Sequence, residues 1–225
     1  MQPKTFEAIY TDDSLLVLNK PAGMLSVPGR GADKQDCLSA RVQQAYPEAF
    51  IVHRLDMATS GLMVMARSLA VQRSMNQLFE SRAVHKRYAA VVHGCMNPVI
   101  NDQPSPVQGV DSWRLIDLPI AVDWPRRPLR VIDTALGKPS QTRWRAVLFD
   151  PSTNTTRLDL EPVTGRSHQL RVHMQALGHP ILGDQLYANP EVAAKSARLL
   201  LHAAWLAFTH PLTGEKMHFT SSPPF

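Results

Sequence analysis

The order of apolar and polar residues at the start of the chain predicts a β-hairpin. Residues 6–10 and 14–20 are two short runs of strand-forming character, and the acidic pair Asp12-Asp13 lies between them. The sequence "PAGM" at residues 21–24 then ends the second strand, because proline and glycine interrupt regular pairing. We therefore expect the chain to begin with an antiparallel strand pair.

Apolar residues recur every three or four positions over several later stretches, which is the spacing of one helix face. Two of these stretches follow a residue that can cap a helix, Asp36 in the first and Ser68 in the second. Gly178 provides a helix stop, and the Asn189-Pro190 pair provides a helix start. The predicted helices cover residues 37–46, 69–82 and 167–178, and a short one begins at residue 190.

Strand patterns occupy much of the remaining chain. The sequence "LMVMA" at residues 62–66 is apolar throughout, as expected for a buried strand. Residues 86–94 alternate, so that Tyr88, Ala90 and Val92 share one face of a strand. Further strands are predicted over residues 142–149, 155–162, 202–210 and 216–221.

Residues 95–141 are the least regular stretch and contain many of the 18 prolines of the chain. Apolar residues such as Leu118 and Ile120 still punctuate it, so we interpret it as loops and edge strands rather than as a linker. Strands that arrive in hairpins, with helices between them and no clean β-α-β alternation, indicate an α+β fold. We expect a mixed, largely antiparallel central sheet flanked by helices and loops, in one domain of residues 1–225 with two lobes.

Composition narrows the class of protein. The chain has 225 residues, of which 44% are hydrophobic, enough for a sizeable core without disulfide staples. Its two cysteines, Cys37 and Cys95, are far apart and indicate neither a disulfide framework nor a thiolate metal site. No signal peptide is evident, and the longest apolar stretch is too short to span a membrane. We therefore expect a cytoplasmic protein.

Charge indicates a polyanionic partner. The formal net charge is +5 and the sequence pI is about 9.5. Basic residues gather in "SRAVHKRY", "WPRRPLR", "TRWR" and "GRSHQLRVH", and aromatic residues such as Trp124 and Trp144 stand among them. Interleaved aromatic and basic side chains are typical of proteins that bind single-stranded or looped nucleic acid, although a solvated basic surface would have the same composition.

Several familiar catalytic patterns are missing. There is no G-x-S-x-G around Ser60 and no glycine-rich phosphate loop, and "HRLD" lacks the other parts of a kinase. A metal site is the remaining alternative, since His168, His173, His179 and Asp184 are close in sequence. Residues five apart do not share a face of a helix or of a strand, so His168 and His173 cannot converge on one ion. We expect these histidines to take part in buried hydrogen bonds, and we predict no metal.

Asp56 is the candidate for chemistry. It stands in "HRLDMATSG", between a His-Arg pair and a Thr-Ser-Gly turn, directly before the predicted buried strand. One interpretation is a turn aspartate that caps the local backbone. The other is a carboxylate in a partly dry cleft, which an arginine keeps ionised and available as a nucleophile or base. No second carboxylate is placed opposite it by the sequence, as glycoside hydrolysis would require.

The chain resembles the RluA family of pseudouridine synthases. The resemblance is carried by "NKPAGMLSVPG", "HRLDMATSGLMVMA", "KRYAAVVHG", "TGRSHQLRVHMQALGHPILGDQLY", "RLLLHA" and "THPLTGE", which occur in the family's order and spacing from about residue 8 to the C-terminus. It is closest to members that modify both transfer RNA and large-subunit ribosomal RNA. It implies the pseudouridine synthase fold with a catalytic cleft, and isomerisation of uridine in RNA after base flipping.

The resemblance also implies the residues of the site. Asp56 matches the essential aspartate, which attacks C1′ of the sugar or C6 of the base, or removes a sugar proton. Tyr88 matches the tyrosine that packs on the target base, and Arg166 matches the arginine that pairs with the aspartate. Arg54 matches a residue that enters the helix vacated by the flipped nucleotide. The other expected RNA-binding residues are His53, Thr59, Arg126, Arg127, His168 and Arg171.

RNA is the expected partner of the protein. The resemblance implies RNA stem-loops as substrates, those of the tRNA anticodon arm and of 23S rRNA, with no cofactor, no membrane and a monomeric enzyme. No S4-like domain precedes "NKPAG", so the catalytic domain would grip RNA alone. The Pro-rich segment at residues 95–118 is longer than expected and would be a further RNA contact. A non-catalytic RNA-binding or folding factor with the same fold is the main alternative.

Overall fold

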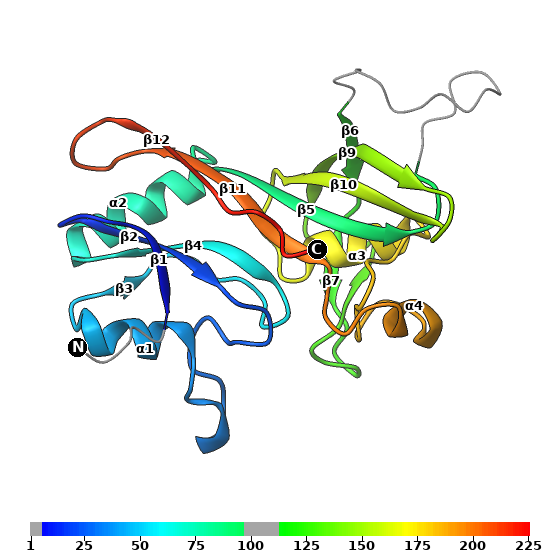
Figure 1. Ribbon diagram of the computed structural model, residues 1–225, viewed down its shortest axis with the longest axis horizontal. Helices are drawn as coiled ribbons and strands as arrows, with labels where there is room; N and C mark the ends of the chain where they lie inside the picture. The colour runs from blue at the N-terminus through cyan, green and yellow to red at the C-terminus, as the bar shows by residue number, and fades with distance from the viewer. Residues whose placement is uncertain (1–5, 97–112) are drawn as a thin grey trace. The chain divides into compact units, whose positions relative to one another are not determined.

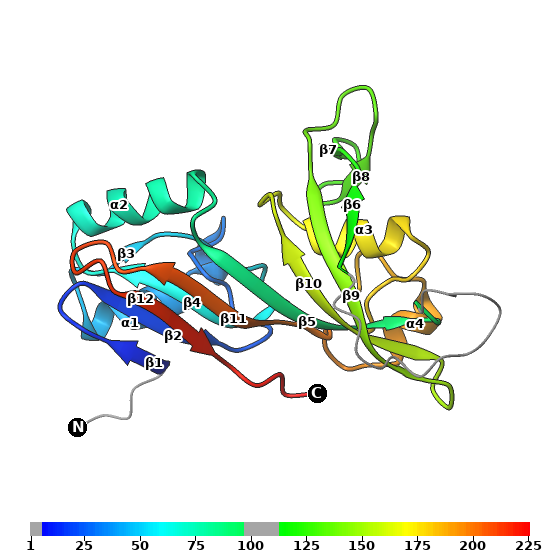
Figure 2. The same cartoon turned by 90° about the horizontal axis from the view of Figure 1, so that it is seen from above.

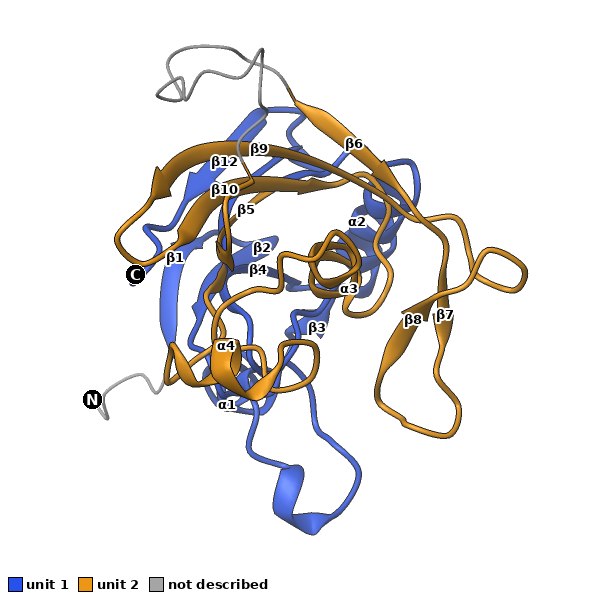
Figure 3. Ribbon diagram, turned by 90° about the vertical axis from the view of Figure 1, so that its right-hand side faces the viewer, with its two compact units in different colours: residues 1–86, 202–225 blue, residues 87–201 orange. Residues whose placement is uncertain are grey.

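The computed structural model describes residues 6–96 and 113–225, which form two compact units (Figure 3). Unit 1 consists of Met1–Lys86 and His202–Phe225, and unit 2 consists of Arg87–Leu201. That two lobes enclose one catalytic cleft stays a prediction. Most of the Pro-rich segment expected to contact RNA lies outside the described residues.

Unit 1 is built on a mixed sheet. Strand β2 pairs with β1 on one side and β4 on the other, β3 also pairs with β4, and β12 pairs with β11, all antiparallel. β11 runs parallel to β4, with His202 opposite Ser60. The strands are β1 (Glu7–Thr11), β2 (Leu15–Lys20), β3 (Phe50–Ile51), β4 (Ser60–Ala66), β11 (Leu201–Thr209) and β12 (Lys216–Thr220).

Two helices cover the two faces of this sheet (Figures 1 and 2). Alternate residues of β2 and β4, such as Leu15 and Val64, pack with α2 (Leu69–Glu80). The intervening residues, such as Leu16 and Met65, pack with α1 (Leu38–Ala45). Because both faces are covered, every residue of β4 is buried, which explains the unbroken apolar run at residues 62–66.

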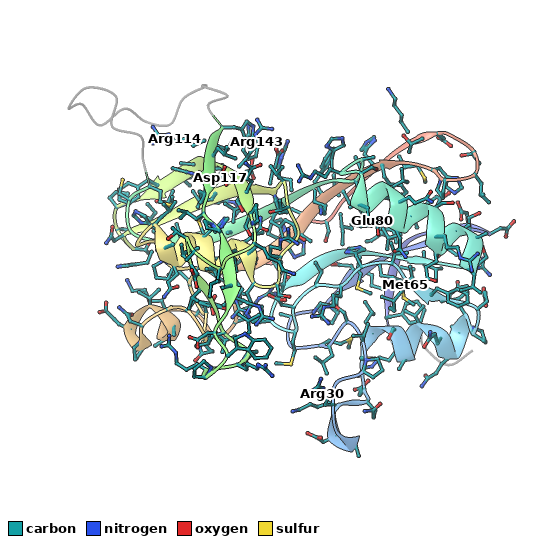
Figure 4. All side chains as sticks on the ribbon, turned by 180° about the vertical axis from the view of Figure 1, so that it is seen from behind. Arg30, Met65, Glu80, Arg114, Asp117 and Arg143 are labelled. Atoms are coloured by element: carbon teal, nitrogen blue, oxygen red, sulfur yellow. The ribbon has the colours of Figure 1, made fainter. Side chains whose placement is uncertain are left out.

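The helix caps differ in part from the prediction. Ser68 caps α2 as expected, since its hydroxyl accepts the N–H of Val71 at 3.2 Å. The prediction that Asp36 caps α1 is wrong, because Cys37 is the N-cap and its Sγ accepts the N–H of Ala40. The carboxylate of Asp36 instead forms an ion pair with Arg41. The loop before α1 holds a short 3₁₀ helix, η1 (Ala32–Lys34), beside Arg30 (Figure 4).

Unit 2 contains an antiparallel sheet in the order β5-β10-β9-β6, and β7 pairs with β8 in a separate two-stranded sheet (Figure 2). Arg114 and Arg143 mark the neighbouring strands β6 and β9 (Figure 4). The elements are β5 (His85–His93), β6 (Arg114–Asp117), β7 (Ile120–Val122), β8 (Arg130–Ile132), β9 (Gln141–Asp150), β10 (Thr155–Pro162), α3 (Gln169–Ala176) and α4 (Pro190–Ala194).

Helix α3 packs on this unit so closely that its first six residues are all buried. Val172 contacts Ile120 of β7 and Tyr187. His173 bonds to the hydroxyl of Thr142 on β9 at 2.9 Å. Leu177 is 38% exposed, because the helix, which we predicted to reach residue 178, has ended before it.

The fold class is confirmed as α+β with a mixed, mostly antiparallel sheet. The predicted hairpins, the Asn189 cap of α4 and the turn at Gly178, with φ 80°, are also present. Among the helices of residues 6–96 and 113–225, none is long and apolar enough to cross a membrane.

Candidate active site

Asp56 lies in unit 1 on the connection between β3 and β4, and it is half-buried. The N–H of Thr59 donates to the carbonyl of Asp56 at 3.1 Å, which closes a turn after the aspartate. The backbone of Asp56 is therefore fixed by the turn. The bond that closes the turn uses the main-chain carbonyl of Asp56, so the interpretation of its carboxylate as a backbone cap stays a prediction.

The segment "NKPAGMLS" holds both neighbours of Asp56. On one side, the hydroxyl of Ser26 donates to the carbonyl of Leu55 at 2.7 Å and accepts its N–H at 3.1 Å. On the other side, the N–H of Gly23 donates to the carbonyl of Met57 at 2.8 Å. Two motifs that are thirty residues apart in sequence thus form one rigid support for the aspartate.

Lys20 completes this support from inside the unit. Its side chain is fully buried, and its ammonium donates to the carbonyls of Pro21, Met24 and Met57 at 2.9, 2.7 and 3.1 Å. A buried ammonium is tolerated only when its hydrogen bonds are satisfied. No role was predicted for Lys20, which lies in the motif "NKPAGMLSVPG", because residue type alone does not distinguish a buried lysine from an exposed one.

The start of β4 is held against β11. Gly61 has φ 110°, and a Cβ added there would lie 2.4 Å from the carbonyl oxygen of Ala203, so only glycine allows this approach. Next to it, the hydroxyl of Ser60 lies 2.7 Å from Nδ1 of the buried His202. Nε2 of His202 in turn lies 3.0 Å from the hydroxyl of Ser221. This buried polar chain fixes the residue after the Asp56 turn.

Tyr88 belongs to unit 2, where it lies on β5 opposite Leu160 of β10. It is half-buried, and the following residues of its face, Ala90 and Val92, are fully buried. The strand prediction for this segment is therefore confirmed.

Arg166 also belongs to unit 2 and is exposed, in the turn that precedes α3. Gln169, which is buried, accepts the N–H of Arg166 at 3.1 Å and the hydroxyl of Thr164 at 2.7 Å. The amide nitrogen of Gln169 donates to the carbonyl of Gln141 and to the hydroxyl of Thr142. The turn that carries Arg166 is thus fixed to β9, and the guanidinium of this exposed residue donates to the carbonyl of Pro139 at 3.4 Å.

Three of the expected RNA-binding residues are exposed. Arg54 lies two residues before Asp56, and Arg126 and Arg127 lie in the loop between β7 and β8. Arg126 pairs with Asp123 at 2.6 Å, while the guanidinium carbon of Arg127 lies 3.5 Å from the centre of the Trp124 ring. Arg54 and these two loop arginines are accessible to a polyanion.

Two other residues that we expected to contact RNA are buried. Arg171 is 4% exposed, and its guanidinium donates to both carboxylate oxygens of Asp184 at 2.8 and 2.6 Å. Thr59 is 3% exposed within the turn after Asp56. Burial and these internal bonds do not support a contact of Arg171 or Thr59 with RNA, and that assignment stays a prediction.

His53 and His168 are half-buried and have partners inside the protein. Nε2 of His53 accepts the N–H of Val64 at 2.9 Å, and burial, with the nearby charge of Lys86, lowers the pKa of His53 to about 3. Nδ1 of His168 lies 2.6 Å from the hydroxyl of Tyr187. The expected role of these two residues in RNA binding is not supported by their contacts.

The other histidines of the rejected metal site are also engaged in hydrogen bonds, as predicted. Besides Thr142, His173 contacts the carbonyl of Leu118 at 3.0 Å, and burial lowers its pKa. Nδ1 of His179 lies 2.8 Å from the carbonyl of His93. In the part of the chain that the structure describes, no group of three or more potential ligands could hold a metal ion.

Comparison with known proteins gives one consistent result. Residues 14–176 match the family model described as "RNA pseudouridylate synthase". The chain is 48% identical to the dual-specificity RNA pseudouridine synthase RluA of Escherichia coli K12 over 217 residues, which cover 96% of this chain and 93% of that protein. It is 45% identical to the RluA of Yersinia pestis, over 96% and 98% of the two chains.

A solved structure supports the same assignment. Human RNA pseudouridylate synthase domain containing 1 is similar with a TM-score of 0.77 and 27% identity, over 100% of this chain and 87% of that one. The residues that surround Asp56, and the turn that carries Arg166, lie within the matched part of the family model.

Proposed function

Because this chain belongs to the RNA pseudouridylate synthase family, we propose that it isomerises uridines in two RNAs, the anticodon stem-loop of tRNA and a stem-loop of 23S rRNA. The family match makes the chain an RNA-modifying isomerase. The choice of two RNAs is supported by 48% identity to a relative whose name states dual specificity. The motifs that this chain shares with the RluA family, in the same order and spacing, support the same choice.

The observation that carries the proposal is the support built around Asp56. The backbone of Leu55 is held by the hydroxyl of Ser26 and that of Met57 by the N–H of Gly23, and the buried ammonium of Lys20 also binds the carbonyl of Met57. A turn held in this way keeps a carboxylate in one geometry, as a reaction at a fixed atom requires. A protein that only binds RNA has no need for such precision at one acidic side chain.

In the proposed reaction the N1–C1′ bond of the target nucleoside breaks, the uracil turns, and C5 bonds to C1′. The proton on C5 is then lost and N1 gains one, so no electrons or groups enter or leave. Asp56 begins this sequence at C1′, at C6, or by removal of a sugar proton. The isomerisation is redox-neutral and uses no group donor, so we assign it no cofactor.

We assign Tyr88 and Arg166 to the same site. A tyrosine that stacks on the extruded base contributes about 1–3 kcal/mol, which offsets part of the few kcal/mol lost on unstacking. The exposed guanidinium of Arg166 is suited to pair with the carboxylate of Asp56 and keep it ionised. This convergence of Asp56 with Tyr88 and Arg166 is part of the proposal.

RNA binding is assigned to the exposed arginines. Arg54 is next to the Asp56 turn in sequence and is the residue that we expect to enter the gap left by the flipped nucleotide. Arg126 and Arg127, with the exposed Trp124, form a cationic and aromatic loop of the kind that contacts RNA. We propose that the enzyme acts as a monomer in the cytoplasm, as its resemblance to the RluA family implies.

The test is a comparison of total RNA from cells with and without the gene, in which pseudouridines are mapped at single-nucleotide resolution. We expect one site in the tRNA anticodon arm and one in large-subunit rRNA to lose pseudouridine when the gene is absent. Loss in only one RNA would refute dual specificity. Unchanged maps would favour the alternative, an RNA-binding factor without catalytic activity.

A further inference from the structure

One buried hydroxyl in unit 2 connects two segments that are far apart in sequence. Tyr187 is 6% exposed, and its hydroxyl accepts the N–H of Arg130 at 2.9 Å. The same oxygen lies 2.6 Å from Nδ1 of His168. Arg130 is the first residue of β8, and His168 directly precedes α3. The hydroxyl therefore joins the β7–β8 hairpin to the turn that carries Arg166.

His168 needs such a partner because of its backbone. Its φ of 59° and ψ of 12° lie in the left-handed region, which residues other than glycine rarely adopt. Strained conformations of this kind persist when the surrounding structure fixes them. The ring of His168 is fixed by the hydrogen bond to Tyr187 and by an edge-on contact with the Tyr187 ring, with centroids 5.6 Å apart.

Tyr187 is itself held in place from its other side. Its N–H donates to the carboxylate of Asp184 at 3.2 Å, and the guanidinium carbon of Arg171 lies 5.1 Å from the centre of its ring. Arg171 and Asp184 form a two-pronged ion pair that is buried. Burial also raises the pKa of Tyr187, so its phenol stays protonated and can donate to His168. The buried arginine is thus part of the support for Tyr187.

We infer that Tyr187 is a positioning residue for Arg166, acting through His168. Arg166 stands two residues before His168, and Gln169 holds its N–H from the other side. Without the hydroxyl, the strained residue would relax and the turn would shift. The inference rests on the proposed function, because it takes Arg166 to act in the reaction. It predicts a loss of rate rather than of RNA affinity.

The test is Tyr187→Phe, which keeps the aromatic ring and its packing and removes the hydroxyl alone. The matched control is Tyr10→Phe, which removes a hydroxyl that donates to Asp12 at 2.7 Å in unit 1. Single-turnover pseudouridine formation and RNA affinity are measured on an RNA stem-loop that the wild-type protein modifies. We expect the rate of Tyr187→Phe to fall tenfold or more, with Kd within threefold, and that of Tyr10→Phe to be unchanged.

A wild-type rate for folded Tyr187→Phe would overturn the inference, and so would a rate loss explained by weaker RNA binding alone. A second variant, His168→Asn, keeps a side chain that tolerates the left-handed region but removes the imidazole. If both residues act through one contact, the double variant is no slower than the slower single variant, within about twofold, and multiplied losses would refute the shared contact. A wild-type protein that forms no pseudouridine would instead refute the proposed function.

Discussion

Replacing Lys20 by methionine tests whether the support around Asp56 depends on a buried charge. Methionine fills similar space and removes three donors, which leaves the carbonyls of Pro21, Met24 and Met57 without the bonds that the ammonium makes at 2.9, 2.7 and 3.1 Å. The last of these belongs to the residue that follows Asp56. The substitution therefore acts on stability and on the geometry of the turn together.

The expected loss of unfolding free energy follows from the three carbonyls that lose a hydrogen bond to the ammonium of Lys20. A hydrogen bond to a charged group contributes about 1.5–3 kcal/mol, but removal of the ammonium also relieves its own desolvation penalty of several kcal/mol. The net loss of unfolding free energy is then about 3–5 kcal/mol. For a chain of 225 residues this corresponds to a Tm decrease on the order of 10 °C.

The measurement combines thermal unfolding with pseudouridine formation at a temperature where the variant is folded. The matched control is Lys34→Met, because Lys34 is exposed. We expect Lys20→Met to lower Tm by about 10 °C and to lower the rate, and Lys34→Met to change neither. Equal Tm values for the two variants would refute the stability argument, and a normal rate of folded Lys20→Met would show that Asp56 does not depend on this anchor.

Three further predictions test other parts of the structure. Gly61→Ala should cost about 2 kcal/mol more than Gly23→Ala, because both have positive φ but only Gly61 meets backbone atoms of β11; equal Tm losses would contradict this. The pKa of His53 is about 3 in the folded state and about 6.5 in the unfolded state, so the unfolded state takes up a proton at a higher pH than the folded state does. The free energy of unfolding therefore falls as pH decreases from about 6.5 towards 3. Denaturant unfolding should show a flatter pH dependence for His53→Gln but not for His218→Gln, whose side chain is exposed. Arg127→Gln should reduce the salt slope of RNA binding by about 1, and an unchanged slope would exclude a phosphate contact there.

The regular elements were predictable because their patterns are local. The apolar run of β4, the Ser68 cap and the paired strands β9 and β10 are each specified by neighbouring residues. The cap of α1 was not, because the helix begins at Leu38, which makes Cys37 the N-cap and leaves the carboxylate of Asp36 to pair with Arg41.

The accessible residues of the candidate site were predictable from the sequence, but the buried residues that hold them in place were not. Asp56, Arg54 and Arg166 were identified from motifs, and all are at least partly accessible. The burial of Arg171 was not predicted, because its charge in a basic motif resembles that of an RNA contact, while its partner Asp184 lies thirteen residues further on. Burial of a charged pair depends on the fold, so residue type alone does not reveal it.

The same reason applies to Lys20, Gln169 and Tyr187. Each is a polar residue with at least one partner in a distant segment, which is Met57 for Lys20, Thr142 for Gln169 and Arg130 for Tyr187. Their signal in the sequence is position, since they stand in the motifs that also contain or flank the site. The partners themselves became known only from the three-dimensional structure.

The central claim is that Asp56 acts in the reaction and not in binding. The most direct test measures pseudouridine formation and RNA affinity for the wild-type protein and for Asp56→Asn on the same RNA stem-loop. We expect Asp56→Asn to form no detectable pseudouridine while its Kd for the RNA stays within about tenfold of the wild-type value. Substantial pseudouridine formation by Asp56→Asn, or a loss of product that arises only because RNA no longer binds, would contradict it.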